Sequence, residues 1–148
     1  MKTRNKIIVT AVILILVVGL VVTFWPAKTT TFNEVVFDDA NVQDITAVEF
    51  RKSNPSNIDI VTVNDPAEIQ QIMSSLSEIE MKKEKIDVSS TDESYTLYIE
   101  MNSAMRYQID LYDEQYIAIY DSELKKNKTT EYTITNNFDL STIRGLFE

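Results

Sequence analysis

The sequence contains no cysteine and no histidine. The absence of cysteine excludes disulfide bonds, thiolate nucleophiles and a lipid-modified cysteine at a membrane exit. The absence of histidine removes the ordinary base at neutral pH and, together with the missing thiols, the usual zinc ligands. Serine hydrolases that use histidine are excluded with them. A Ser-Lys pair stays open, although no serine and lysine stand out by their spacing.

Glycine is nearly as scarce, with Gly19 and Gly145 as the two examples in the chain. A phosphate-binding loop needs glycines, because backbone amides must approach the ligand closely. Gly19 lies in the apolar N-terminal run and Gly145 lies near the C-terminus, so we expect no such loop. The spacing and the glycine of an EF-hand calcium loop are also missing. We therefore expect no cofactor and no metal site.

Positive charge is scarce as well, with 14 Lys and Arg against 23 Asp and Glu and a formal net charge of −9. Four of the bases precede the first acid, Glu34, which leaves 10 bases against 23 acids, a balance of −13, from residue 33 onward. Such a surface repels nucleic-acid phosphates and anionic lipid headgroups, since both interactions need clustered Lys and Arg. We expect no nucleic-acid partner.

One long hydrophobic run is present, from Ile7 to Trp25, and no charge interrupts it. As a helix that rises ~1.5 Å per residue it would be ~28 Å long, which matches a hydrocarbon layer of ~30 Å. The bases before the run predict a cytoplasmic N-terminus, and Trp25 stands where an interfacial aromatic belongs. The sequence thus predicts a cytoplasmic tail over residues 1–6 and a single-pass transmembrane helix over residues 7–25, which places the remainder outside the cell.

A cleaved signal peptide is the main alternative and would make the protein secreted. Its charged start fits, but signal cores usually run ~7–15 residues, and the exit Phe24-Trp25-Pro26-Ala27-Lys28 lacks a small-x-small cleavage site. A buried helix of a soluble protein is opposed by the flanking charges and by the lack of a polar face. We therefore favour an uncleaved anchor in the cell membrane.

The part beyond the apolar run is long enough for one domain. We expect a linker over residues 26–43 and an extracellular domain over residues 44–148. Its first strands are expected at Ile45–Arg51 and Ile58–Val63, joined into a hairpin by the turn residues 54–57.

The clearest expected element is a helix that begins after Asp65. Asp65 can cap it, Pro66 suits its first position, and Glu68 completes a capping-box spacing. The apolar residues step by three and four and form one stripe that must cover a core. They are Ile69, Ile72, Met73, Leu76 and Ile79. We expect the helix to end before Ser89, with Glu78, Lys82, Lys83 and Glu84 in solvent.

Apolar residues then alternate with period two, which predicts a meander of strands. The expected strands contain Tyr95–Met101, Tyr107–Leu111, Tyr116–Tyr120 and Tyr132–Ile134. Turns are expected at residues 102–104 and 113–115, and a short final helix from Asp139. The order β-β-α-β-β-β-β-α implies an α+β fold, with a mostly antiparallel sheet and one main helix packed on a face.

Four acids crowd one end of the expected meander: Asp110, Asp113, Glu114 and Asp121. Paired carboxylates can do acid-base work on a polysaccharide. Asp and Glu are also ordinary at turns and on wet strand faces, so we favour that interpretation and expect no catalytic residue. A carboxylate-dependent enzyme on cell-wall polymers stays an alternative, which a deep cleft with two acids of raised pKa would favour.

Tyrosine is concentrated in the same meander. An exposed aromatic row can hold a sugar or a partner peptide, because the ring offers a flat apolar face with a polar tip. Tyrosine also favours strands, and half of these residues should point into the core, so packing is the simpler role. The residues that we single out as a partner-binding surface are Tyr98, Tyr112, Tyr116 and Tyr120.

Three features together give the chain a recognisable layout. These are the Lys-rich start with its single apolar segment, the stretch Ile58-Asp59-Ile60 leading into Asp65-Pro66-Ala67-Glu68-Ile69, and the Tyr/Ile meander. The layout resembles that of small membrane-anchored extracellular domains of unknown function from Gram-positive bacteria such as bacilli. The resemblance implies a cell-surface location and no catalytic residues.

We expect, from these observations, a cell-surface accessory or interaction domain without catalytic activity. A tail of about six residues cannot carry a signalling domain, so any signal must pass through a membrane or cell-surface protein partner. Gly19 and Thr23 give small faces one turn apart that could pack against such a partner. The alternatives are the wall-polymer enzyme and a secreted acidic inhibitor that is steered toward a basic target.

Overall fold

The computed structural model describes residues 28–38, 40–53, 57–124 and 128–148. The expected cytoplasmic tail over residues 1–6 and the expected transmembrane helix over residues 7–25 lie outside these ranges. Among the residues that are described, no helix combines the length and the apolar character needed to cross a bilayer.

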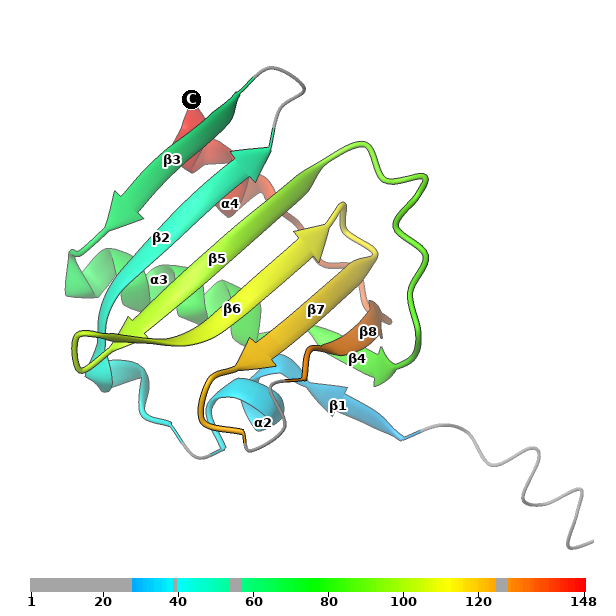
Figure 1. The fold of residues 1–148 in the computed structure, drawn as a ribbon, viewed down its shortest axis with the longest axis horizontal. Helices are drawn as coiled ribbons and strands as arrows, with labels where there is room; N and C mark the ends of the chain where they lie inside the picture. Colours follow the sequence, from blue (N-terminus) through cyan, green and yellow to red (C-terminus); the bar gives the residue numbers. More distant parts are fainter. Residues whose placement is uncertain (1–27, 39, 54–56, 125–127) are drawn as a thin grey trace, which may run out of the picture.

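The described chain folds into one antiparallel sheet with a few helices, which confirms the α+β class (Figure 1). The strands are β1 (Thr29–Thr31), β2 (Ile45–Ser53), β3 (Ile58–Val63), β4 (Glu80–Lys83), β5 (Ser94–Met101), β6 (Ala104–Tyr112), β7 (Tyr116–Asp121) and β8 (Thr130–Ile134). The helices are α2 (Phe32–Val36), α3 (Pro66–Ser77) and α4 (Ser141–Arg144), with 3-10 turns η1 (Val42–Asp44) and η2 (Gly145–Phe147).

The eight strands lie in the order β1-β4-β8-β7-β6-β5-β2-β3. The predicted meander from β5 to β8 forms the centre of the sheet. The hairpin of β2 and β3 adds to β5, whereas β4 and β1 add to β8. Strands β1 and β3 are therefore the two edges, and they lie at opposite ends of the sheet (Figure 1).

Helix α3 begins as its sequence predicts. The Asp65 carboxylate accepts hydrogen bonds from the amides of Ala67 (3.1 Å) and Glu68 (3.0 Å), and Pro66 occupies the first turn. The helix packs against the sheet because its apolar stripe is buried there. The residues on the stripe that are almost fully buried are Ile69, Ile72, Met73 and Leu76.

The end of α3 differs from the prediction, because the helix stops at Ser77 and residues 80–83 form strand β4. Ile79 and Met81 are both completely buried, with exposed Glu80 between them. This is the period-two alternation of a strand. The sequence did not reveal the strand, because the three-residue step from Leu76 to Ile79 also fits a helix.

Residues 29–36 belong to the fold, although the sequence analysis assigned them to a linker. Thr31 and Glu34 form a reciprocal capping box at the start of α2. Phe32 is completely buried, and its amide donates to the carbonyl of Ile79 at 2.9 Å. The Thr-x-x-Glu spacing ahead of Val35-Val36 is a helix-start signal. With β1, α2 and β4 included, the predicted element order is wrong at these three places.

The two predicted turns of the meander are confirmed. Asn102 and Ser103 have φ values of 52° and 66°, so both central residues of the β5–β6 turn are left-handed. Such a turn matches the twist of the strands that it joins. Asp113 has a φ of 50° in the β6–β7 turn.

Candidate partner-binding face

One face of the sheet is left uncovered by the helices of the described chain. Helices α3 and α4 lie behind the sheet in Figure 1, and the inner face that they cover holds the core, including Tyr95 and Tyr107. Side chains alternate between the two faces of a strand, so the intervening residues point to the front. We call this front surface the open face.

The strand register orders the open face into rows. Tyr98, Gln108 and Tyr120 oppose one another across β5, β6 and β7. The next row is Thr96, Asp110, Ala118 and Glu131, and the row after it is Ser94, Tyr112, Tyr116 and Thr133.

All four tyrosines singled out from the sequence lie on the open face, and each is partly buried. Tyr112 and Tyr116 are direct cross-strand neighbours, and Tyr98 and Tyr120 flank Gln108. The two pairs are four residues apart along β6, about 13 Å at strand spacing. The structure therefore brings the tyrosines together as two pairs, with Asp110 and its row between them.

Polar contacts hold the centre of the open face in place. The Asp110 carboxylate accepts from the Thr96 hydroxyl at 2.8 Å and from the Gln108 amide at 3.2 Å. The guanidinium of Arg51 lies 4.6 Å from the centroid of the Tyr98 ring. Burial, followed by the charge of Asp110, raises the pKa of Tyr112 above its ordinary value.

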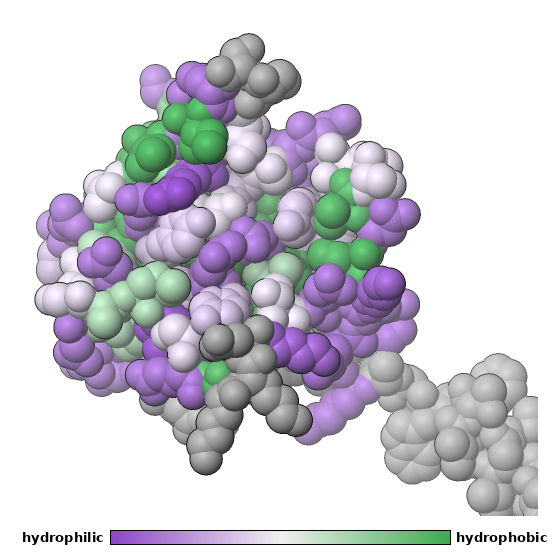
Figure 2. Space-filling view, in the orientation of Figure 1, coloured by the Kyte–Doolittle hydropathy of each residue, from purple (hydrophilic) through white to green (hydrophobic). Residues whose placement is uncertain are grey.

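Strand β3 extends the open face with two exposed isoleucines that the sequence analysis treated as ordinary strand residues. Ile58 is 58% exposed and Ile60 is 55% exposed. Ile60 opposes Arg51, so it lies on the same face as Tyr98. Figure 2 shows a hydrophobic patch over β3 at the upper left of this face. Because β3 pairs with β2 alone among the described strands, its outer side is an edge.

The four acids expected at one end of the meander are separated by the fold. Asp110 lies on the open face, and Asp113 and Glu114 lie in the β6–β7 turn. Asp121 lies at the other end of β7, where its carboxylate accepts from Arg106 at 2.9 Å. The antiparallel course of β7 explains the separation, since its two ends lie at opposite ends of the meander.

Asp113 and Glu114 line a cleft of about 680 Å³, together with Asp92, Glu93 and Arg144. Arg144 donates to Glu93 at 2.8 Å and to Glu114 at 2.9 Å. The Asp113 carboxylate accepts from the amide of Glu93 at 2.9 Å. Glu93, Asp113 and Glu114 therefore already have cationic or amide partners.

The carboxyl pKa values that clearly shift among the described residues all shift downward. They are those of Glu34, Asp87, Glu93 and Asp139. The hydrogen bond from Arg144 is the main cause for Glu93. A general acid needs a raised pKa, whereas the pKa values of these four carboxyl groups are lowered. Within the described ranges, no three acids are grouped so that they could hold a metal ion.

Comparison of the chain with models of protein families, with curated proteins and with solved structures gave no match.

Proposed function

We propose that this protein is a cell-surface interaction domain without catalytic activity, tethered to the membrane through Ile7–Trp25. Its partner is a membrane or cell-surface protein that docks on the open face. The observation that supports this proposal most strongly is the uncovered face itself, with its four partly exposed tyrosines beside Ile58 and Ile60.

The chemistry of the open face suits a protein partner. Tyrosine rings contribute large contact areas with little conformational freedom to lose, and they are enriched among residues that dominate binding energy. Asp110 and Arg51 are already held by neighbours, so a partner would meet polar groups that are preorganised. The apolar side chains of Ile58 and Ile60 extend this contact to the β3 edge.

A carboxylate-dependent enzyme on wall polymers is the second candidate, because the cleft around Arg144 holds several acids. The downward pKa of Glu93 and its pairing with Arg144 argue against a proton-donating role. A secreted acidic inhibitor is the third candidate and requires cleavage of the N-terminal segment.

Photocrosslinking in intact cells tests the proposed docking face. Benzoylphenylalanine in place of Tyr98 or Tyr120 should give one discrete adduct with a membrane or surface protein. The matched control places the same group at Gln71, an exposed residue of α3 behind the sheet. Equal labelling from both sides of the sheet, or none from the open face, would contradict the proposal.

A binding measurement then tests whether the adduct reflects recognition. The captured protein should bind the full-length chain, and Tyr98→Ser with Tyr120→Ser should weaken that affinity about tenfold or more, as loss of central aromatic contacts does. Gln71→Ser should leave the affinity unchanged.

The enzyme candidate has its own test. Full-length protein incubated with purified wall polymer should release no fragments. Fragment release that is lost in Glu93→Gln or Glu114→Gln would favour the enzyme over the interaction domain.

A further inference from the structure

Five lysines gather at the β1 end of the sheet. Lys28 directly precedes β1, Lys82 and Lys83 lie in β4, Lys85 follows β4, and Lys128 precedes β8. The sheet joins these segments, since Thr29 pairs with Lys82 and Lys83 pairs with Tyr132. Lys83, Lys85 and Lys128 also line one shallow cleft. We call these five residues the lysine edge.

The lysine edge differs from the rest of the described surface in its charge. Its five lysines stand beside four carboxylates, those of Glu34, Glu80, Glu84 and Glu131, whereas the other described residues contain four bases and 18 acids. Those four bases are each held in an ion pair: Arg51, Lys52, Arg106 and Arg144. On the lysine edge Lys82 is paired with Glu84 at 3.7 Å, whereas Lys83, Lys85 and Lys128 are exposed.

The path of the chain brings the lysine edge close to the membrane. The predicted span ends at Trp25, and three residues separate it from β1. Four residue steps reach at most about 14 Å, and the headgroup layer on one side is about 5–7 Å thick. In the sheet β4 lies beside the edge strand β1, and β8 lies beside β4 (Figure 1). These strands must therefore stay near the headgroups.

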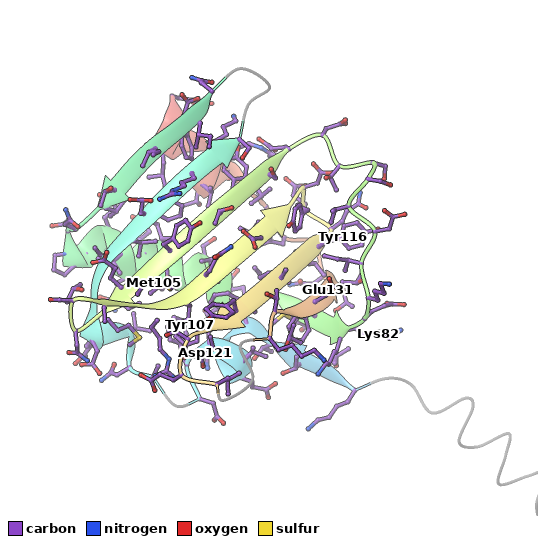
Figure 3. The ribbon with its side chains drawn as sticks, viewed as in Figure 1. Lys82, Met105, Tyr107, Tyr116, Asp121 and Glu131 are labelled. Carbon is purple, nitrogen blue, oxygen red and sulfur yellow. The ribbon has the colours of Figure 1, made fainter. Side chains whose placement is uncertain are left out.

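The opposite edge of the sheet lies far from this point. Seven strand spacings of about 4.8 Å separate β1 from β3, up to about 34 Å along the sheet. In Figure 3, Lys82 and Glu131 lie at the right of the view and Met105 of β6 lies at the left. Among the described residues, the lysines therefore gather at the end of the domain near the anchor, and the remainder of the domain is acidic.

We propose that the lysine edge contacts the anionic lipid headgroups of the membrane that holds the chain, and that this contact keeps the domain upright with β3 outermost. The inference rests on the proposed membrane tether. Anionic headgroups attract nearby lysines and repel the acidic remainder, so both forces favour the same orientation. Strand β3 and its exposed isoleucines then lie far from the membrane, where a partner can reach them.

Depth measurements on reconstituted full-length protein test the orientation. The chain has no cysteine, so a single introduced cysteine carries a fluorophore, either at Thr129 beside Lys128 or at Thr62 on β3. Lipids with spin-labelled headgroups quench a fluorophore that approaches the membrane surface. In vesicles that contain about a third phosphatidylglycerol, quenching at Thr129 should exceed that at Thr62 about threefold or more. In purely zwitterionic vesicles the difference should shrink.

Substitutions test whether the orientation depends on the lysines of the lysine edge or on the total positive charge of the domain. Lys83→Gln with Lys85→Gln should remove most of the dependence on anionic lipid, whereas Arg51→Gln with Lys52→Gln removes the same charge elsewhere and should preserve it. Thermal unfolding of each variant checks that the domain is folded. Equal quenching at both positions, or a difference that is independent of anionic lipid and of the lysines, would overturn the inference.

Flotation of the vesicles separates failure of this inference from failure of the tether. A chain that floats with vesicles of either composition but shows no orientation contradicts the lysine-edge contact alone. A chain that fails to float with zwitterionic vesicles contradicts the tether. Because the lysine-edge contact rests on the tether, that result contradicts the contact as well.

Discussion

At the scale of single residues, Arg144 joins distant parts of the chain. Its guanidinium lies between Glu93, just before β5, and Glu114 in the β6–β7 turn, and so ties the C-terminal α4 to the sheet. Glu93 also accepts a hydrogen bond from the hydroxyl of buried Tyr95. Two carboxylates and one cation thus stabilise the packing of the last helix.

Replacing Arg144 with glutamine should lower stability in a pH-dependent manner. The hydrogen bond from Arg144 holds the pKa of Glu93 below its ordinary value of 4.5. A lowered carboxyl pKa stabilises the folded state above the ordinary value and loses this contribution as pH falls through the lowered value. Since the Arg144 side chain is 40% exposed, we expect a loss of about 1 kcal/mol at pH 7.

Urea unfolding of the full chain in detergent micelles measures this difference. The gap between wild type and Arg144→Gln should close as the pH is lowered below about 4. Arg51→Gln is the control, because Arg51 pairs with Glu49 on its own strand and ties no second element to the sheet. A gap that is constant with pH would contradict this role of Arg144.

At the scale of elements, local periodicity predicts most of the sheet. Period-two alternation places β5 and β6, and turn residues place the hairpins between the strands, because both signals act over a few neighbouring residues. The same alternation puts Tyr98, Tyr112, Tyr116 and Tyr120 on one face. Their shared face could therefore be predicted, whereas their division into two pairs depends on the register of β6.

The missed elements depend on contacts between distant segments. Strand β1 has three residues and forms by pairing with β4, which is about fifty residues away in the chain. Strand β4 continues an apolar spacing that also fits a helix. The exposure of Ile58 and Ile60 follows from the position of β3 at the sheet edge, which a strand pattern alone does not reveal.

Phe32 tests whether residues 29–36 are part of the domain. The side chain is completely buried, so Phe32→Ala should cost about 3–5 kcal/mol of unfolding free energy through lost burial and a residual cavity. A flexible linker would lose almost nothing. Asn33→Ala is the matched control, because Asn33 is exposed on the same helix. Equal unfolding midpoints for the two variants would contradict this assignment and indicate that residues 29–36 are a linker.

At the scale of the whole molecule, three surfaces have separate expected roles. The lysine edge lies where the chain enters the domain, the open face presents the tyrosines, and β3 forms the far edge with its two exposed isoleucines. This arrangement has a direction, from the proposed anchor at β1, along the open face where the proposed partner docks, to the β3 edge. It depends on the N-terminal segment remaining attached to the domain.

Cell fractionation with an intact-mass measurement tests the proposed tether most directly. The full chain, tagged at its C-terminus, is expressed in a Gram-positive host, and intact cells are treated with protease. We predict a membrane-bound protein of full-length mass, 17.0 kDa plus the tag, whose domain is degraded by external protease. A shortened, soluble product in the medium would contradict the tether and favour the secreted acidic inhibitor.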